Sequence, residues 1–169
     1  YMPDLNRDNV EYQNAETVII EEGITGIGGW SFYSMSSLKR VQLPESLVFI
    51  GPSAFSYCSA LKECVLPASL KSIGNFAFSD CDEWIPEVTE SGWFKIIDGL
   101  IMSGNGRVLH FCPEVTGIGK VTIPEGTRSV KEYAFSRLES LSTLVIPNGV
   151  TLEKSAVFGC EALVCVVAD

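Results

Sequence analysis

Residues 41–61 read VQLPESLVFIGPSAFSYCSAL, and residues 64–81 repeat the same pattern as CVLPASLKSIGNFAFSDC. Equivalent positions recur every 23 residues: this is the spacing of Pro44 and Pro67 (67 − 44) and also of Phe55 and Phe78 (78 − 55). A fixed period of this length means that one unit does not bury its own apolar face and must stack on its neighbours. The sequence therefore predicts a solenoid.

The same period extends in both directions from this stretch. Units begin at equivalent positions near Ala15, Leu38, Leu61, Ile118 and Leu141. A partial unit runs from Leu163 to the end of the sequence. The unit after Leu141 fits only if one residue is missing between Pro147 and Leu152, which places Val157 where other units have phenylalanine. We therefore expect the last full unit to be degenerate.

Each unit divides into three pieces. Apolar residues alternate in Leu38–Leu43, which predicts a short strand that ends at Pro44, because proline lacks the N–H group that a sheet ladder requires. A second short run, Leu47–Ile50, precedes a glycine. Ala54–Cys58 then indicates a helical or 3₁₀ turn that buries alanine and phenylalanine. Parallel stacking of such units places equivalent side chains in columns, with about 4.8 Å between coils.

The units resemble the BspA-like leucine-rich repeats, whose pattern is a strand ending in Leu-Pro, followed by Ser-Leu, Ile-Gly, Ala-Phe, Cys and Leu. The match is strong in residues 41–61 and 64–81, good in 121–141, and weaker in 18–38 and after Pro147. The resemblance implies a leucine-rich-repeat solenoid, a right-handed stack of units with parallel β-strands, short helical or 3₁₀ turns and an inserted β-hairpin or meander. It also implies a secreted or cell-surface bacterial protein that acts in adhesion or partner binding and is not a catalyst. No site residue carries over from it.

A long segment interrupts the period, since the step from Pro67 to Pro124 (124 − 67) is more than twice the step from Pro44 to Pro67 (67 − 44). Asp98-Gly99 separates two apolar runs and is a strong signal for a two-residue hairpin. Because the insert is apolar and short, we expect a small β-meander that packs on the solenoid. The chain is then one domain: a lead-in or capping strand in 1–14, repeats in 15–84, the insert in 85–117, and repeats in 118–169, the last incomplete.

Composition narrows the classes of function. The chain has 12 basic and 21 acidic residues, a net charge of −9, and no cluster of lysine and arginine, so we expect no nucleic-acid partner. No apolar run reaches the roughly 18 residues of a membrane span. The sequence opens on Tyr1 without a signal peptide, so we expect a processed piece of a longer precursor that is secreted or held at the cell surface.

The sequence lacks the residue patterns of an enzyme or a metal protein. His110 is the one histidine, so a nucleophile and a third, orienting group would have to come from elsewhere in the fold. There is no CxxC pair, and the glycines at 23, 26, 28 and 29 coincide with turn positions of the repeat. We therefore expect no catalytic residue, no cofactor and no metal site.

The six cysteines are better explained by the repeat than by a disulfide framework. Cys58, Cys81 and Cys160 occupy the same position of three units, where a small thiol packs in the core or meets a main-chain carbonyl. We expect these thiols to be free, because parallel stacked side chains seldom reach the dihedral angle of a disulfide. Cys64 replaces a core valine, whereas Cys112 and Cys165 lie off the pattern and are either paired or exposed.

The strand pattern also names a candidate binding face. If Val41 points inward, Arg40 and Gln42 point outward, and the same phase holds in the other units. The candidate partner-binding residues on this face are Ile19, Arg40, Gln42, Glu63, Val65, Thr122, Thr143, Val145 and Val167. One row along the face is mostly apolar, which favours a docking surface; the alternative is the general preference of β-branched residues for strands.

Two kinds of function follow from this face. The first is a protein- or glycan-binding module whose partner is an extracellular protein or glycan of unknown identity. The second is a structural spacer that displays other domains of a longer surface protein. A spacer predicts uniformly polar exposed positions and an unbroken period, and this chain has neither, so we favour the binding module. The open sheet edge after Leu163 is compatible with a monomer or a weak homo-oligomer.

Overall fold

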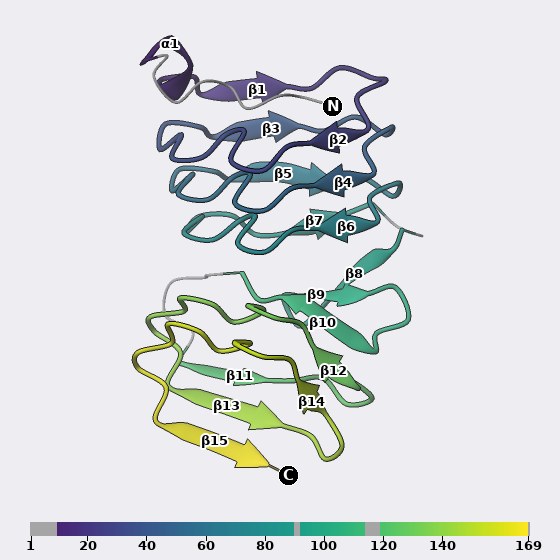
Figure 1. The fold of residues 1–169 in the computed structure, drawn as a ribbon, viewed down its shortest axis with the longest axis vertical. Coiled ribbons are helices and arrows are strands. Elements are labelled where there is room, and N and C mark those ends of the chain that lie inside the picture. The colour runs from purple at the N-terminus through teal and green to yellow at the C-terminus, as the bar shows by residue number, and fades with distance from the viewer. Residues whose placement is uncertain (1–9, 90–91, 114–118, 169) are drawn as a thin grey trace.

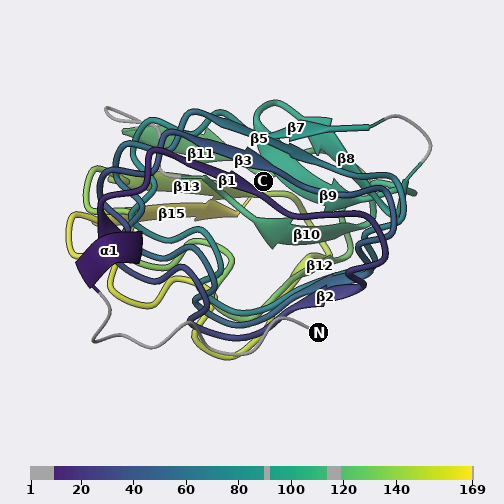
Figure 2. The same ribbon diagram turned by 90° about the horizontal axis from the view of Figure 1, so that it is seen from above.

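The computed structural model describes residues 10–89, 92–113 and 119–168. These residues form a β-solenoid of about six turns with almost no helix (Figure 1). The fold predicted from the repeat is therefore confirmed. Seen from above, successive coils follow nearly the same outline, and the short helix α1 (Val10–Gln13) lies at one corner (Figure 2).

Residues 10–89, which we call the N-terminal block, carry two parallel sheets. The first contains β1 (Thr17–Ile19), β3 (Arg40–Gln42), β5 (Glu63–Leu66) and β7 (Glu87–Val88). The second contains β2 (Gly26–Ile27), β4 (Phe49–Ile50) and β6 (Ser72–Ile73). The register agrees with the repeat, since Val18 pairs with Val41 and Val41 with Cys64.

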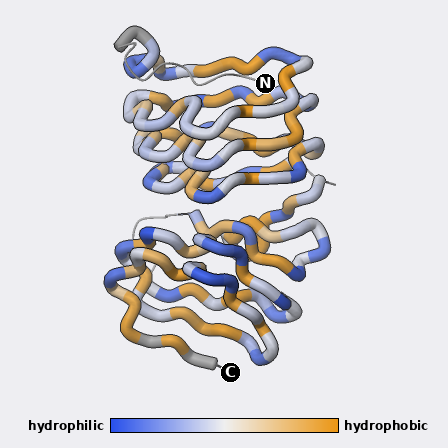
Figure 3. Tube along the Cα trace, viewed as in Figure 1, coloured by the Kyte–Doolittle hydropathy of each residue, from blue (hydrophilic) through white to orange (hydrophobic). Residues whose placement is uncertain are grey.

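Residues 119–168, the C-terminal block, continue the solenoid in separate sheets. One contains β11 (Lys120–Thr122), β13 (Thr143–Ile146) and β15 (Cys165–Ala168). The other places β12 (Ser129–Val130) and β14 (Thr151–Leu152) beside β10 (Val108–Phe111), β9 (Leu100–Ser103) and β8 (Phe94–Ile97). In Figure 3 the hydrophobic colour recurs along the strands of both blocks.

Columns of equivalent side chains fill the core of each block. The rings of Phe32, Phe55 and Phe78 stack with centroids 5.1 and 5.2 Å apart, and all three are buried. Trp84 ends this column, with its ring 4.0 Å from that of Phe78 and its indole N–H donating to the Cys64 carbonyl at 3.0 Å. Trp84 therefore ends the phenylalanine column from the leucine position of the repeat, one period after Leu61 (84 − 61).

The segments around the buried Ala-Phe pairs are successive turns, and this differs from the expected helical or 3₁₀ turn. Ser53 and Tyr57 have φ angles of 53° and 62°, and Phe76 and Asp80 have 60° and 59°. A residue with positive φ every four positions prevents regular right-handed helix, which needs negative φ throughout. Among the described residues, α1 is the only helix.

The last full unit is shortened as the sequence predicts. Lys120 pairs with Thr143, a full period further on (143 − 120), whereas Ser129 pairs with Thr151, one position short of a full period (151 − 129). The missing residue therefore lies between these strands, and Val157 follows Ala156 in the position that phenylalanine fills elsewhere. The N–H of Phe135 donates to the Ala156 carbonyl, as that of Phe55 donates to Ala77.

The expected meander is present as β8, β9 and β10, which we call the hairpin layer. β8 and β9 are antiparallel, and so are β9 and β10, but β10 also pairs in parallel with β12. One face of the layer, Phe94, Ile101 and Phe111, packs into the N-terminal core. The other face, Leu100, Met102 and Leu109, packs into the C-terminal core. The layer is therefore buried on both faces between the two blocks, which explains its apolar sequence.

The ends of the interrupting segment belong to solenoid sheets. β7 pairs with β5 as the last strand of the first N-terminal sheet, and β10 begins the sheet that continues through β12 and β14. The two blocks also touch on the turn side, where the Phe76 and Tyr133 rings are 4.4 Å apart and Arg137 lies 3.7 Å from the Asp80 carboxylate.

The explanation of the cysteines is confirmed for the shared position. The thiols of Cys58, Cys81 and Cys160 donate to the carbonyls of Phe32, Phe55 and Phe135 at 3.2, 3.1 and 2.7 Å. Cys58, Cys64 and Cys81 carry no disulfide. Cys112 is not off the pattern, because its N–H donates to Ala134 as Phe55 donates to Ala77, so it is buried in the phenylalanine position. The Cys165 side chain lies outside the described residues.

No helix in the described ranges combines the length and the apolar character that crossing a bilayer would need. Of the expected lead-in, residues 10–13 form α1, and residues 1–9 lie outside the described part of the chain.

Candidate functional site

The face predicted from strand alternation is exposed in the N-terminal block and only partly exposed in the C-terminal block. In β3, Arg40 and Gln42 are exposed while Val41 is buried, and in β5, Glu63 and Val65 are exposed while Cys64 is buried. Ile19 is 64% exposed and Val65 47%. In the C-terminal block Thr122 is exposed, whereas Thr143 and Val145 are half-buried. The Val167 side chain lies outside the described residues.

The apolar row is not one continuous ladder. In the N-terminal block Ile19 pairs with Gln42, and Val65 pairs with Glu87. In the C-terminal block Thr122 pairs with Val145 and Val145 with Val167, but in a different sheet. The hairpin layer separates the two sheets, so the structure brings the candidate residues together as two groups.

The N-terminal group forms a hollow that we call the sheet pocket. Its volume is about 380 Å³, and four candidate residues from two adjacent strands contribute to its lining: Arg40, Gln42, Glu63 and Val65. The other residues that line it are Val41, Leu43, Glu45, Pro67 and Thr89. The pocket therefore combines an exposed valine with polar and charged side chains around it.

An ion pair bridges the two strands within this pocket. Arg40 Nε lies 2.6 Å from Glu63 Oε2, in register with the pairing of the two residues across β3 and β5. The hydrogen bond and the charge of Glu63 raise the pKa of Arg40 above its usual value. Both side chains are more than half exposed, so the pair contributes little to stability and is available to a partner.

The second group lies beside another hollow that the sequence did not indicate. This pocket, of about 380 Å³, lies between the hairpin turn Asp98–Gly99 and the strand β11, and Lys120 and Thr122 line it. The sequence predicts the hairpin turn at Asp98-Gly99, but it does not predict which strand lies beside that turn. Thr143 and Val145 are not among the residues that line this pocket.

The one histidine of the chain lies apart from the sheet pocket. His110 lies on β10 with its ring edge-on to Phe94, 5.0 Å between centroids, and does not line the sheet pocket. Burial, with a further contribution from Lys131, lowers the pKa of His110 to about 4, so the imidazole is neutral near pH 7. Within the described ranges, no group of three or more histidine, cysteine, aspartate or glutamate side chains is placed to hold a metal ion.

Comparison with solved structures gives the same architecture. A leucine-rich cell surface protein from Faecalibacterium prausnitzii is 27% identical with a TM-score of 0.68, over 90% of this chain and 41% of that one. The pneumococcal vaccine antigen PcpA is 20% identical with a TM-score of 0.61, over 90% and 51%. A leucine-rich repeat protein from Bacteroides ovatus is 20% identical with a TM-score of 0.58, over 92% and 43%.

The chain thus spans about half, or less, of the length of these three proteins. No curated protein sequence matches it. The sequence profile of the BspA type leucine-rich repeat region matches six copies over residues 6–99 and 110–167. Repeats of this family are generally non-catalytic and support a protein-interaction module. With nine-tenths of its length covered by these copies, the chain belongs to the BspA type leucine-rich repeat family.

Proposed function

We propose that this chain is a non-catalytic binding module of a secreted or cell-surface bacterial protein, and that its partner docks at the sheet pocket. The observation that carries the proposal is the hollow between β3 and β5, to which Arg40, Gln42, Glu63 and Val65 all contribute. The Faecalibacterium protein is a cell surface protein, which supports the same location for this chain.

The composition of the sheet pocket fits a recognition surface. Interfaces combine an apolar centre with a polar, solvent-accessible rim, and arginine is enriched in them. Here Val65 supplies the apolar centre, with 47% of its surface exposed, and Arg40 and Glu63 supply the rim. Ile19, two strands away on the same face, extends the apolar surface. The partner is an extracellular protein or glycan, and docking there is the step that adhesion would require.

Binding of the purified chain to immobilised extracellular-matrix proteins, other cell-surface proteins and glycans tests this proposal. We expect a saturable signal that Val65→Lys abolishes, because a buried ammonium group at the centre of an interface is costly to desolvate. Val164→Lys is the matched control, since Val164 is 87% exposed and lies outside the strands of the face. Binding that survives Val65→Lys, or a blank across the panel, would favour the spacer function instead.

A further inference from the structure

The second sheet of the N-terminal block stops at β6, although the solenoid continues beyond it. Inside this sheet, the N–H groups of Lys71 and Gly74 donate to the carbonyls of Val48 and Ile50, each at 2.8 Å. The equivalent carbonyls one coil later, those of Lys71 and Ile73, accept no backbone hydrogen bond from any described residue. β10, the next strand in this position, pairs with β9 and β12 instead.

A cavity of about 300 Å³ lies along this edge, and we call it the junction notch. Residues 71–78 form one wall, and His110, Lys131 and Glu153 contribute to the other. Ile73 is half-buried, whereas Ile27 and Ile50, its counterparts in the column, are 0% and 1% exposed. The notch is therefore the place that a further strand would fill, both for hydrogen bonding and for covering the isoleucine.

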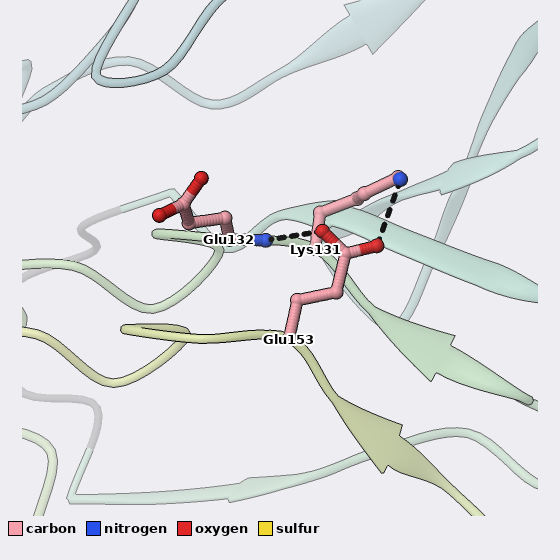
Figure 4. A network of polar contacts seen from close by, with 3 residues as sticks. All are labelled: Lys131, Glu132 and Glu153. Atoms are coloured by element: carbon pink, nitrogen blue, oxygen red, sulfur yellow. Dashed lines mark hydrogen bonds and ion pairs between the residues drawn. The ribbon is translucent and has the colours of Figure 1, made fainter.

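Lys71, Lys131 and Glu153 in the notch already have partners. Lys131 Nζ lies 2.8 Å from Glu153 Oε1, and Glu153 Oε2 accepts the Glu132 N–H at 3.2 Å (Figure 4). The Glu132 carboxylate points away from this pair in the same view. Lys71 Nζ lies 5.7 Å from the centre of the Trp93 ring. A small charged ligand would thus compete with the contacts of these three side chains, while no residue in the described ranges donates a backbone hydrogen bond to the carbonyls of Lys71 and Ile73.

We propose that the junction notch binds one extended peptide segment of a partner protein by strand addition to β6. The segment runs parallel to β6, donates main-chain N–H groups to the carbonyls of Lys71 and Ile73, and places an apolar side chain over Ile73. Strand addition draws affinity from main-chain hydrogen bonds and specificity from the side-chain positions. The notch has the volume of the smallest ligand pockets, which suits a short segment and excludes a folded domain.

The probe for the test is a synthetic peptide with the sequence of residues 69–75, SLKSIGN, acetylated and amidated at its ends. This peptide has the sequence of the strand that a further coil would place there. The control peptide is N-methylated at the glycine, which removes the donor that Gly74 uses within the sheet. Binding is followed by fluorescence anisotropy and by the NMR signal of His110, the only histidine of the chain, which lines the notch.

We expect saturable binding of the peptide, a shift of the His110 signal, and binding about tenfold weaker for the N-methylated control, because a buried acceptor loses its donor. Asn75→Trp should abolish binding by filling the notch, since Asn75 is an exposed residue of its wall. Asn148→Trp, at an exposed turn outside the notch, should leave it unchanged. Unaltered melting temperatures show that both variants fold.

Absence of saturable binding, or equal binding of the two peptides, would overturn the proposal. So would binding that Asn75→Trp leaves intact, because the peptide would then lie elsewhere. Val65→Lys should not affect the peptide, since Val65 does not line the notch, so failure here is distinguishable from failure at the sheet pocket.

Discussion

The close stacking of the N-terminal coils makes Gly51 the most informative position for a test of the packing. Gly28, Gly51 and Gly74 occupy the same position of three successive coils. A Cβ atom on Gly51 would lie 2.5 Å from the Gly29 nitrogen and 2.7 Å from the Gly28 carbonyl carbon. The shorter distance falls 0.9 Å below the 3.4 Å at which ordinary contact begins (3.4 − 2.5). Because these are main-chain atoms, no side-chain rotation relieves the contact, and the coils must separate.

Overpacking of this kind typically costs about 1–3 kcal/mol, and the rigid neighbours place Gly51→Ala at the upper end. The reduced entropy of the unfolded chain offsets roughly 0.4–1 kcal/mol of that cost. We therefore expect Gly51→Ala to lower the free energy of unfolding by about 2–3 kcal/mol. For a chain of this size, this corresponds to a fall in melting temperature of roughly 4–12 °C.

Thermal unfolding followed by circular dichroism measures this effect, with Gly119→Ala as the matched control. The nearest atom to a Cβ at Gly119 is Ser142 Oγ at 3.7 Å, and its φ angle is not positive. Gly119→Ala should therefore leave the melting temperature unchanged or raise it slightly. If Gly51→Ala melted within ~2 °C of the wild type, the cost would be under about 1 kcal/mol. The claim that the coils must separate, at a cost in stability, to accommodate the Cβ atom would then be refuted.

Two further predictions concern titratable groups. Burial lowers the pKa of His110 to about 4, so the NMR titration of the single imidazole should have its midpoint near pH 4, and a midpoint above 6 would contradict its burial. Because the unfolded chain takes up this proton near pH 6.5, the contribution of His110 to stability is present above that pH and is lost as the pH falls towards 4. Burial also raises the pKa of Cys58 to about 12 and raises that of Cys64, so iodoacetamide at pH 8.5 should label neither thiol until denaturant is added, as peptide mapping would show. Rapid labelling of either thiol in the folded protein would be inconsistent with this packing.

Much of the fold can be predicted from the repeat, because each residue in the stack contacts the equivalent residue of the neighbouring coil. The constant spacing of the units suffices to stack Phe32, Phe55 and Phe78, since each coil meets the next with the same geometry. The outward phase of Arg40 and Gln42 follows from strand alternation alone. The turns with positive φ were not predictable, because Tyr57 and Phe76 adopt that conformation only where the stacked coils impose it.

The positions of the strands around the insert depend on which distant strand each of them pairs with. The additional length between Pro67 and Pro124 removes the register, so the sequence does not say whether β10 pairs with β6 or with β12. Trp84 occupies the leucine position of the repeat, one period after Leu61 (84 − 61), but its larger ring stacks on Phe78 at the end of the phenylalanine column. The hairpin layer lies between β7 and β11 in the chain, which is why the candidate residues fall into two sheets, although strand alternation assigned each of them to the exposed face.

Two of the three hollows described above lie where the period breaks. A strictly periodic array repeats the same contacts at every coil and offers one uniform face, as expected for a spacer. Here the sheet pocket ends at Thr89, directly after β7, and the second pocket includes Asp98 at the hairpin turn. The junction notch includes His110 and Phe111 at the end of the hairpin layer. The hairpin layer and its turn therefore line the second pocket and the junction notch, whereas the sheet pocket is lined mainly by residues 40–67 and reaches the interrupting segment only at Thr89. A variant that shortened the hairpin layer would therefore alter the second pocket and the junction notch and leave the sheet pocket in place, whereas removal of the first coil, which lines none of the three, would leave all of them in place.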